Sequence, residues 1–461
     1  MCVSQLHFII CRARFFIHEF NHWNLKYVPF LTDPVSSNAS ASAVPPNAPA
    51  QSRRPALAGL RVLDLARVLA GPTCAQTLGD LGADVVKIER PVVGDDTRPW
   101  GPPWLPDEHG EPTRDSTYFS SANRNKRSIA IDLANDAGAA LVRRLAREAD
   151  VLIENYKFGD LARRGLDYAT LSALNPRLIY CSITGFGQSG PLRERPGYDY
   201  IFQGVGGLMS VTGLPDGVPG GGPMKIGASI VDLSTGLYAG IAILAALRER
   251  DASGLGQSID MALFDTVAAL STHQAAGYFQ TGKVPGRMGT SSGGIMMPYE
   301  TFKCADGHLI VACGNNTQWQ SLCTALARGD LASDPRLATP SLRQINRDFA
   351  LGELRCTFAA NKVDDLAAKL DAGGVPNGPI NDLKQVFEME QASVRGLKIE
   401  LERSDGTRVA GVGNPIRLSA TPVQYRSAAP KLGEHAVAVL TDWLGAGSEE
   451  IEQLRAAGAL G

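Results

Sequence analysis

The sequence predicts an α/β fold, in which a large domain built on a mainly parallel sheet is joined to a smaller α+β domain. Short apolar runs rich in β-branched residues alternate with segments of helical periodicity through the first half of the chain. This alternation is typical of βαβ units, whose neighbouring strands run parallel. After a Gly/Ser-rich stretch at 286–294 the pattern changes to that of hairpins. The chain of 461 residues is long enough for two or three domains.

The large domain is predicted to open with a strand, a helix and a second strand. Residues 60–65 and 83–88 are strand-like, and Pro72 marks the start of a helix that continues over 73–81, because proline is favoured in the first helical turn. The segment 136–149 is predicted as an amphipathic helix, since its apolar and arginine-bearing faces are separated. The other predicted strands are 128–133, 151–154 and 178–183, and the other predicted helices are 199–209 and 236–250.

The rest of the organisation follows from shifts in composition. Residues 34–55 are dominated by Ser, Ala, Asn and Pro and read as a linker. The extension before it carries Arg and Ser and few acids, so a targeting role stays open. A hairpin is predicted from 299–303 and 308–311 around an Ala-Asp-Gly turn. We expect an extension and linker at 1–55, the large domain at 56–285, a small domain at 286–375, and a return segment at 376–461 that completes the large domain.

Composition and charge exclude several functional classes. Lys and Arg number 45 against 47 Asp and Glu, a formal net charge of −2, so neither a nucleic-acid footprint nor a polybasic membrane signal is expected. The longest apolar run, 236–247, has 12 residues, shorter than the ~18 or more that predict a membrane span. The 8 cysteines include no C-x-x-C pair, so we expect buried thiols in a reducing compartment and no bound metal.

Three sequence motifs match known signatures without their structural context. His18–His22 fits the zincin pattern H-E-x-x-H but lies in the extension. Gly185–Gly190 fits G-x-G-x-x-G, yet Pro191 follows where a dinucleotide-binding helix would open. Gly289–Gly293 fits G-x-S-x-G without a strand before it or a helix after it. We interpret the second as a glycine-rich turn and the third as a loop.

Asp232, in the segment KIGASIVDLSTG (225–236), is the candidate with the most chemical content. It stands at the start of an apolar helix, where Ser234 and Thr235 are expected to cap and the positive end of the helix dipole is expected to keep the carboxylate ionised. The residues alone leave two interpretations open, an N-cap aspartate and a reactive carboxylate.

The chain from residue 57 to about 444 resembles the family III CoA-transferases, the carnitine-dehydratase and bile-acid-inducible group. The matching segments are LAGLRVLDLARVLAGP (57–72), LGDLGADVVKIERPVVGDDTR (78–98), NRNKRSIAIDL (123–133), ADVLIENY (149–156), IYCSITGFGQSGP (179–191) and GASIVDLSTG (227–236). Three further segments, 94–104, 116–131 and 284–316, are similar to the branch that moves CoA from succinyl-CoA to glutarate.

The resemblance implies a role for Asp232. In this family the nucleophile is the aspartate of a G-A-x-x-x-D segment, which here is Asp232. The implied reaction transfers CoA from an acyl-CoA to a free carboxylate through an aspartyl anhydride and an aspartyl-CoA thioester, and covalent catalysis divides this exchange into easier steps. The acyl-CoA is then a substrate, and no permanently bound cofactor or metal is expected.

The resemblance also implies residues that contact substrates. The CoA contacts implied are Arg67, Val68, Leu69, Arg90, Ile131, Ala134, Asn155, Arg163, Arg164 and Tyr198. At the position of Ala134 the family often has Lys, which would supply a cationic phosphate contact. The acyl-side and loop residues implied are Asp199, Gly293, Gly294 and Arg287, with Arg98 competing with Arg287 for the second carboxylate of a dicarboxylic acid.

The same residues leave several functions open. An α-methylacyl-CoA racemase has a Gly-His-Asp segment where this chain has Gly197-Tyr198-Asp199, and a phenol is a poor substitute for imidazole near neutral pH. A transferase with a different acceptor acid, a CoA-ester-binding protein without turnover and an NAD-dependent dehydrogenase also stay open. The resemblance further implies an interlocked homodimer with a Rossmann-like large domain. We expect a cytoplasmic location, or the mitochondrial matrix if 1–55 is a transit segment.

Overall fold

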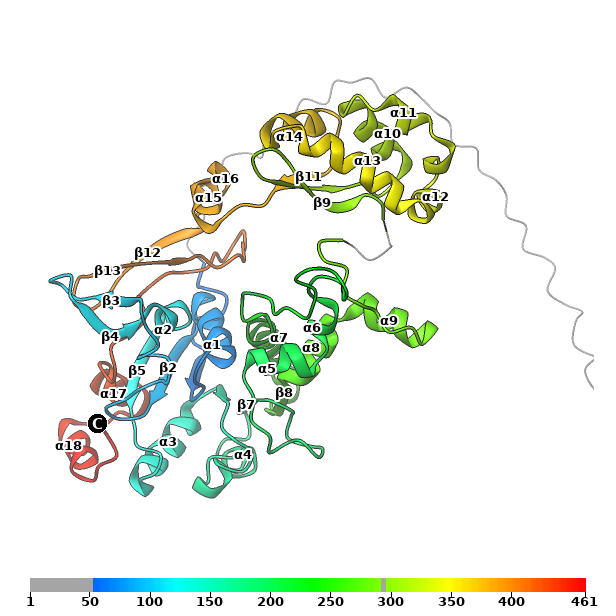
Figure 1. The fold of residues 1–461 in the computed structure, drawn as a ribbon. Helices are drawn as coiled ribbons and strands as arrows, with labels where there is room; N and C mark the ends of the chain where they lie inside the picture. The colour runs from blue at the N-terminus through cyan, green and yellow to red at the C-terminus, as the bar shows by residue number, and fades with distance from the viewer. Residues whose placement is uncertain (1–52, 292–295) are drawn as a thin grey trace, which may run out of the picture. The chain divides into compact units, whose positions relative to one another are not determined.

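A six-stranded parallel sheet organises the large part of the chain (Figure 1). The computed structural model describes residues 53–291 and 296–461. The strand order is β5-β2-β1-β6-β7-β8, and every neighbouring pair is parallel. The strands are β1 (Arg61–Asp64), β2 (Asp84–Glu89), β5 (Lys126–Ala130), β6 (Val151–Glu154), β7 (Ile179–Thr184) and β8 (Ser258–Ala262). This confirms the predicted α/β class, and the sheet contains all five predicted strands plus β8.

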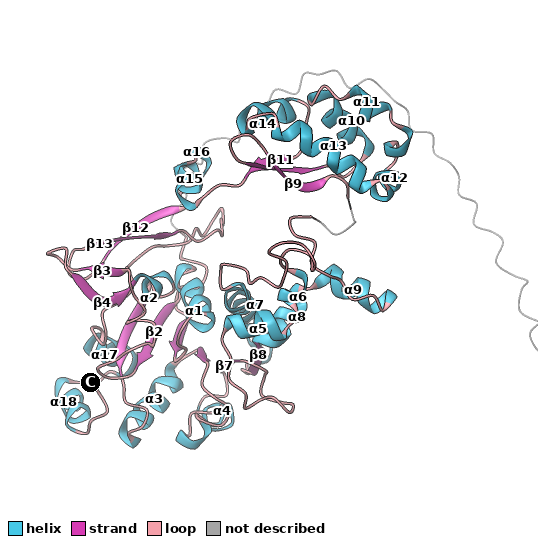
Figure 2. Cartoon of the chain, in the orientation of Figure 1, coloured by secondary structure: helices cyan, strands magenta, loops and turns pink. Residues whose placement is uncertain are grey.

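Helices cover both faces of this sheet (Figure 2), and the buried residues form a separate hydrophobic core on each face. Successive residues of β1 point to opposite faces, so Val62 packs with α1 and α7 while Leu63 packs with α3 and α17. The covering helices are α1 (Ala70–Asp80), α3 (Asp136–Glu148), α4 (Tyr168–Leu174), α5 (Asp199–Val205), α7 (Ile230–Ser253), α8 (Leu263–Leu270), α17 (Ala436–Leu444) and α18 (Ser448–Ala456). The C-terminal helices therefore share a core with the N-terminal strands.

A separate core is formed entirely by residues between Met297 and Val375. Its sheet is antiparallel, in the order β11-β10-β9, and Lys303 pairs with His308 across the predicted turn. The strands are β9 (Tyr299–Lys303), β10 (His308–Ala312) and β11 (Asn377–Pro379), and the helices are α10 (Asn316–Ala325), α11 (Gly329–Ser333), α12 (Pro340–Ile345), α13 (Arg347–Ala359) and α14 (Val363–Ala372). The predicted hairpin is confirmed.

Several smaller elements lie between the larger ones. Two hairpins absent from the sequence prediction pair β3 with β4 and β12 with β13. The strands of the hairpins are β3 (Trp104–Pro106), β4 (Pro112–Ser116), β12 (Lys398–Glu402) and β13 (Arg408–Val412). The smaller helices include α2 (Thr117–Ser121), α6 (Leu208–Val211), α9 (Thr272–Thr281), α15 (Leu383–Glu388) and α16 (Glu390–Val394).

Two helices differ from their predicted ranges for local reasons. The helix predicted over 199–209 is divided into α5 and α6, because Gly206 and Gly207 interrupt it and Gly207 has a φ of 86°. Helix α7 begins at Ile230 and extends to Ser253, so it starts six residues before the predicted 236.

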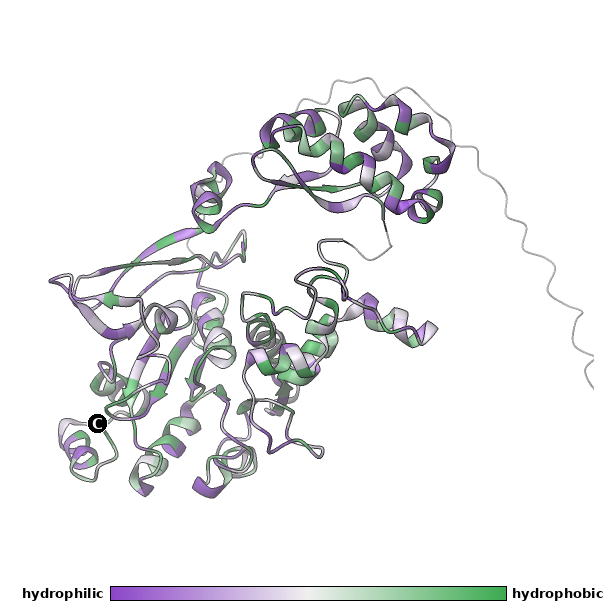
Figure 3. Cartoon of the chain, viewed as in Figure 1, coloured by the Kyte–Doolittle hydropathy of each residue, from purple (hydrophilic) through white to green (hydrophobic). Residues whose placement is uncertain are grey.

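The length of α7 also corrects the expectation about membrane spans. With 24 residues and a mean hydropathy of 1.8 over its most apolar window, α7 is long and apolar enough to cross a membrane by length and composition alone. The 12-residue run counted in the sequence underestimates it. About 33% of that window is buried in this structure, where α7 packs against α1, β7 and β8. Apolar residues also mark α7 and α8 in Figure 3.

Several predictions concern residues outside the described ranges. The motif at 18–22, most of the extension, Gly293 and Gly294 all lie there. Within the described ranges, no group of acidic, His and Cys side chains is arranged to hold a metal ion. Five of the six described cysteines are buried free thiols, as predicted, whereas Cys356 is exposed.

Candidate active site

The start of α7 places Asp232 in a buried, acidic environment. Asp232 is the third residue of the helix and only 9% exposed. The N-cap residue, Ser229, makes no side-chain capping bond. The cap comes instead from α5, where Asp199 Oδ1 accepts hydrogen bonds from Val231 N at 2.8 Å and from Asp232 N at 3.1 Å.

This arrangement corrects the predicted capping. Thr235 Oγ1 donates to Val231 O within the helix at 2.7 Å and therefore does not cap the free N–H groups. A carboxylate that is 33 residues away in the sequence performs this function, and no local pattern reveals it.

A rigid frame holds the capping carboxylate in place. Gln203 Nε2 donates to Asp199 Oδ2 at 2.6 Å, and Gln203 Oε1 accepts from Ile226 N at 2.8 Å. Gly197, just before α5, is required because a Cβ there would lie 2.6 Å from the ring of Phe202. Both Phe202 and Gln203 are buried. The loop before α7 and the start of α5 are thereby fixed relative to each other.

Burial and a like charge raise the pKa of Asp232. Desolvation is the larger cause and the nearby Asp199 carboxylate the second, and together they raise the pKa from 3.8 to about 7. The expectation from the sequence that the helix dipole keeps the carboxylate ionised is therefore wrong, because burial and the Asp199 charge outweigh the dipole. In the described chain, no hydrogen bond or ion pair neutralises the Asp232 side chain, which leaves both oxygens available to a ligand.

Close helix packing brings the loop after β1 toward Asp232. Helices α1 and α7 are packed against each other, and a Cβ at Gly236 would lie 2.5 Å from Ala70 O. Only glycine allows this approach, since a larger residue would push the helices apart. Ala70 begins α1 and Gly236 lies one turn after Asp232. The predicted nucleophile and the predicted coenzyme loop at 67–69 therefore belong to one region.

Tyr118 is a residue of this region that the sequence analysis did not identify. It lies on α2, and its ring packs edge-on against Trp100 at 5.4 Å between centroids. Burial raises the pKa of Tyr118, and the charge of Asp232 raises it further. The phenol is thus a hydrogen-bond donor within electrostatic reach of the candidate nucleophile. Its segment was part of the family resemblance, but nothing in one sequence singles out this tyrosine.

The predicted coenzyme residues next to β1, β2 and β6 are brought together. Asn155 accepts from Arg67 N at 2.9 Å and donates to Arg67 O at 2.7 Å. Asp96 forms ion pairs with both Arg67 and Arg90. The Arg67 guanidinium lies over the ring of Tyr156 at 4.9 Å, and its Nε is buried with no hydrogen-bond partner among the described residues. Two guanidinium groups at the carboxyl ends of parallel strands suit an anionic ligand such as a phosphate.

The other predicted coenzyme residues form a second group. Arg164 Nη1 donates to Leu133 O at 2.6 Å, which places its side chain beside the exposed Ala134. Arg163 has 71% of its side chain exposed and pairs with Asp160. Ile131 is fully buried in a core and therefore contributes shape rather than a polar contact.

The two candidate arginines for the acceptor acid differ in how they are paired. Arg98 is buried, with Nε and Nη2 each 2.7 Å from Glu89 and Nη1 2.6 Å from Asp115. Arg287 donates through Nε to Leu214 O at 3.3 Å and forms an ion pair with Asp216, whose side chain is 84% exposed. A ligand can therefore displace Asp216 from Arg287 more easily than it can displace the buried partners of Arg98, since exposed ion pairs contribute little to stability.

The segment that follows β7 carries the remaining predictions. No helix opens at Gly190, and the chain continues through turns to α5 at Asp199, which confirms a glycine-rich turn rather than a dinucleotide site. Tyr198 is 65% exposed and directly precedes the capping Asp199. Its phenol is available at the surface of the described chain, where a ligand can reach it.

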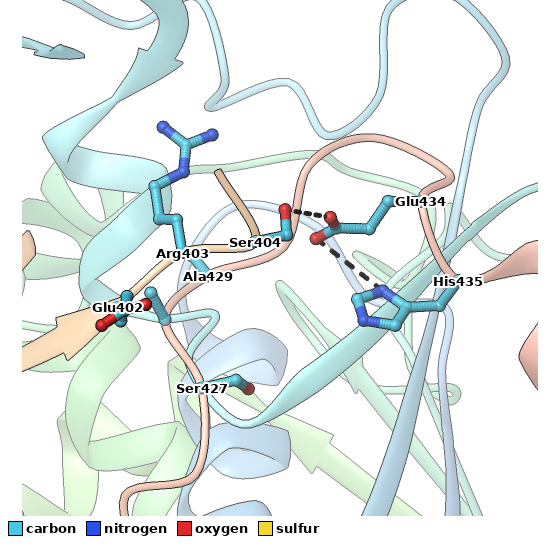
Figure 4. A pocket seen from close by; sticks show the side chains of 8 residues that line it. Glu402, Arg403, Ser404, Ser427, Ala429, Glu434 and His435 are labelled. Carbon is cyan, nitrogen blue, oxygen red and sulfur yellow. Dashed lines mark hydrogen bonds and ion pairs between the residues drawn. The ribbon is translucent and has the colours of Figure 1, made fainter. Parts of the chain in front are cut away.

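Two cavities are lined by other residues. One of about 260 Å³ is lined by Arg403, Ser404, Glu434 and His435 among others (Figure 4). Ser404 Oγ donates to Glu434 Oε2 at 2.5 Å there. The other, of about 630 Å³, is lined by residues of 394–425. Neither cavity is lined by a predicted site residue.

Comparison with known proteins gives consistent results. The family model for CoA-transferase family III matches residues 57–436. A succinate–glutarate CoA-transferase of Agrobacterium fabrum is 48% identical over 85% of this chain and 96% of its own. A succinyl-CoA:glutarate CoA-transferase of Mus musculus is 40% identical over 90% of this chain and 92% of its own. The crystal structure of a CAIB/BAIF family protein from Brucella suis has a TM-score of 0.76 at 48% identity, covering 85% of this chain and all of that chain.

Proposed function

Because the chain belongs to CoA-transferase family III, we propose that it transfers CoA from succinyl-CoA to glutarate with Asp232 as the covalent nucleophile. The chain is a CoA-transferase, and its relatives from Agrobacterium fabrum and Mus musculus, named for succinate or succinyl-CoA and glutarate, support these two substrates. The observation that carries the mechanism is the Asp232 carboxylate, which is buried, unneutralised and raised in pKa to about 7.

In the proposed first half-reaction, an Asp232 oxygen attacks the thioester carbonyl of succinyl-CoA. The C–S bond breaks, CoA leaves as a thiolate, and a succinyl-aspartyl anhydride remains. The thiolate then attacks the aspartyl carbonyl, which releases succinate as a carboxylate and leaves an aspartyl-CoA thioester. A carboxylate whose pKa is near 7 is more basic than an ordinary aspartate and is still partly ionised at neutral pH, which suits a nucleophile.

The second half-reaction runs the same steps in reverse with glutarate. A glutarate oxygen attacks the aspartyl thioester and expels the CoA thiolate, and the thiolate then attacks the glutaryl carbonyl and frees Asp232. Each addition places negative charge on a carbonyl oxygen, and fixed donors stabilise that charge. Tyr118, whose pKa responds to the Asp232 charge, is the described hydroxyl that we assign to this role.

The acceptor brings a second carboxylate that must be bound. An unpaired buried carboxylate is costly, and the planar guanidinium of arginine can bind it with two hydrogen bonds. We assign this role to Arg287, because each nitrogen of Arg98 already has a carboxylate partner within the fold. The exposed Asp216 that pairs with Arg287 is then displaced by the substrate.

An acyl-exchange screen tests this function. Succinyl-CoA and glutaryl-CoA are each incubated with a panel of dicarboxylates and monocarboxylates, and the new thioesters are identified by mass spectrometry. Formation of glutaryl-CoA from succinyl-CoA and glutarate, absent with Asp232→Asn, is the expected result. Hydrolysis of the thioesters without exchange, or a preference for monocarboxylates, would contradict it.

We also propose that the protein is a homodimer. Large apolar side chains are exposed on α5, α7 and α9, including Ile201 on α5, Leu237 and Ile241 on α7, and Phe279 on α9, which is 75% exposed. Apolar faces of this extent are unusual on a monomer, and the family resemblance implies a second copy. Light scattering after gel filtration should give twice 49.0 kDa, and a mass of one chain would contradict the proposal.

For the compartment we propose the cytoplasm, or the mitochondrial matrix if residues 1–55 act as a transit segment. The six described cysteines are all free thiols, as is typical of a reducing compartment. Fusion of residues 1–55 to a fluorescent reporter tests the second location, and a diffuse signal would exclude it.

A further inference from the structure

The loop between β1 and α1 contains a valine in a conformation that its side chain disfavours. Val68 has a φ of 71°, within the left-handed region that β-branched residues rarely adopt. Such a residue persists only where its surroundings determine it, and strained residues of this kind cluster at functional sites. Val68 lies between Arg67 and Leu69, in the loop that is packed toward Asp232.

Side chains from other elements hold the two peptide groups that precede Val68. Asp95 Oδ1 accepts from Val68 N at 3.3 Å, and Lys87 Nζ donates to Ala66 O at 2.7 Å. Asn155 bonds both backbone groups of Arg67. The loop conformation is therefore set by long-range contacts rather than by its own sequence.

Two of these side chains form a fully buried ion pair. Lys87 Nζ lies 2.8 Å from Asp95 Oδ2, and both side chains are 0% exposed. Thr97 fixes the same carboxylate, with its N at 2.9 Å and its Oγ1 at 2.8 Å from Asp95 Oδ1. Buried pairs contribute little to stability compared with apolar residues of the same size, so stability alone does not account for a pair that touches the strained loop on two sides.

We propose that Lys87 and Asp95 are positioning residues for the coenzyme. They hold Val68 in its left-handed conformation, and this fixes the backbone and the Arg67 side chain where CoA binds. The inference rests on the proposed function, in which the loop at 67–69 contacts CoA. A misplaced loop costs binding because preorganisation is lost and must be restored by the ligand.

Asp95→Asn tests the proposal in two backgrounds. The amide keeps Oδ1 as an acceptor for Val68 N but loses the charge that pairs with Lys87. We expect the Kd for free CoA, measured by titration calorimetry, and the KM for succinyl-CoA each to rise about tenfold, the scale of one charged hydrogen bond. The kcat at saturating substrates should stay within about threefold, because the reacting groups are untouched.

The second background is Val68→Gly. Glycine adopts a φ of 71° without strain, so the loop then needs less support from Asp95. We expect Asp95→Asn to weaken CoA binding by no more than about threefold in this background, a coupling that a double-mutant cycle measures directly. A loss of equal size in both backgrounds would show that Asp95 affects CoA binding independently of the Val68 conformation, and would overturn the proposal.

A control and a milder variant make the result decisive. Asp80→Asn alters another fully buried carboxylate, paired with Arg124 and not in contact with the loop; it should lower Tm and leave the Kd for CoA unchanged. If Asp95→Asn does not fold, Thr97→Val removes one bond to Asp95 and should raise the Kd about threefold, again less with Val68→Gly. Wild-type protein that binds no CoA would contradict the proposed function itself. Binding that is unchanged in the variants would overturn the positioning role alone.

Discussion

Replacing Asp199 by asparagine should make the enzyme active at lower pH. The change removes the second cause of the raised Asp232 pKa, while Oδ1 remains an acceptor for the N–H groups of Val231 and Asp232. The cap of α7 is therefore retained. Besides the charge, the change removes the bond that Gln203 Nε2 donates to Asp199 Oδ2, because the new amide nitrogen cannot accept it.

The size of the effect follows from the pKa itself. A rise from 3.8 to about 7 corresponds to roughly 4 kcal/mol against the charged form, at 1.36 kcal/mol per unit. Burial is the larger of the two causes, so the share of Asp199 is less than half, or at most about 1.5 units. Since only the ionised Asp232 attacks, activity rises with pH through this pKa. In Asp199→Asn the rise should occur at a pH lower by roughly 0.5–1.5 units.

The assay is the pH dependence of kcat/KM for succinyl-CoA between about pH 5 and pH 9, which reports ionisations of the free enzyme. Asp260→Asn is a matched control, because this carboxylate bonds Gln188 N and is not a cause of the Asp232 shift. If the rise of kcat/KM with pH stays at the same pH in Asp199→Asn, or moves to higher pH, the electrostatic argument is refuted. An equal shift in the control would refute its specificity.

Three further predictions concern stability, the acceptor and the reaction type. Burial raises the pKa of Glu154 from 4.5 to about 7, so its ionised form destabilises the fold above pH 7 and not below about pH 4.5. Glu154→Gln should therefore raise the free energy of unfolding by roughly 2–3 kcal/mol in urea at pH 8. An equal gain at pH 4.5 would contradict this. Arg287→Lys should lower kcat/KM for glutarate by an amount equivalent to roughly 1.5–3 kcal/mol of transition-state binding, and change kcat/KM little for a monocarboxylate of equal length. Equal losses for the two acids would mean that Arg287 only shapes its loop. Because Tyr198 replaces the racemase histidine, a chiral 2-methylacyl-CoA in deuterated water should gain no α-deuterium, whereas rapid incorporation would assign the protein to the racemases.

The sequence predicted those parts of the fold that local patterns determine. Strand β6 has its predicted bounds, Val151–Glu154, and both ends of β1, β2 and β7 lie one residue from their predicted positions, because buried parallel strands are continuous apolar runs. Strand β8, SIDMA, was missed since its alternating pattern is short and two of its five residues are acidic or hydroxylic. The hairpin of β12 and β13 was missed as well, because its residues are mostly exposed.

The site was predictable at single residues but not in its interactions. Asp232 was found through its segment, yet its capping by Asp199 joins residues 33 positions apart, and its raised pKa depends on burial that only the packed fold creates. The strain at Val68 is invisible for the same reason, since Lys87 and Asp95 impose it through tertiary contacts. Tertiary contacts therefore overturned the expectations that rested on local structure alone, namely capping by Thr235 and a carboxylate kept fully ionised by the helix dipole.

Direct detection of the enzyme-bound thioester tests the central claim that Asp232 is the nucleophile. Protein mixed with succinyl-CoA in the absence of glutarate is quenched and measured by intact-protein and peptide mass spectrometry. We predict a mass increase of one CoA less one water, located on the peptide that contains Asp232, and its loss together with at least ~1,000-fold of the exchange rate in Asp232→Asn. Exchange at near wild-type rates in Asp232→Asn, or an adduct on a different residue, would contradict the account.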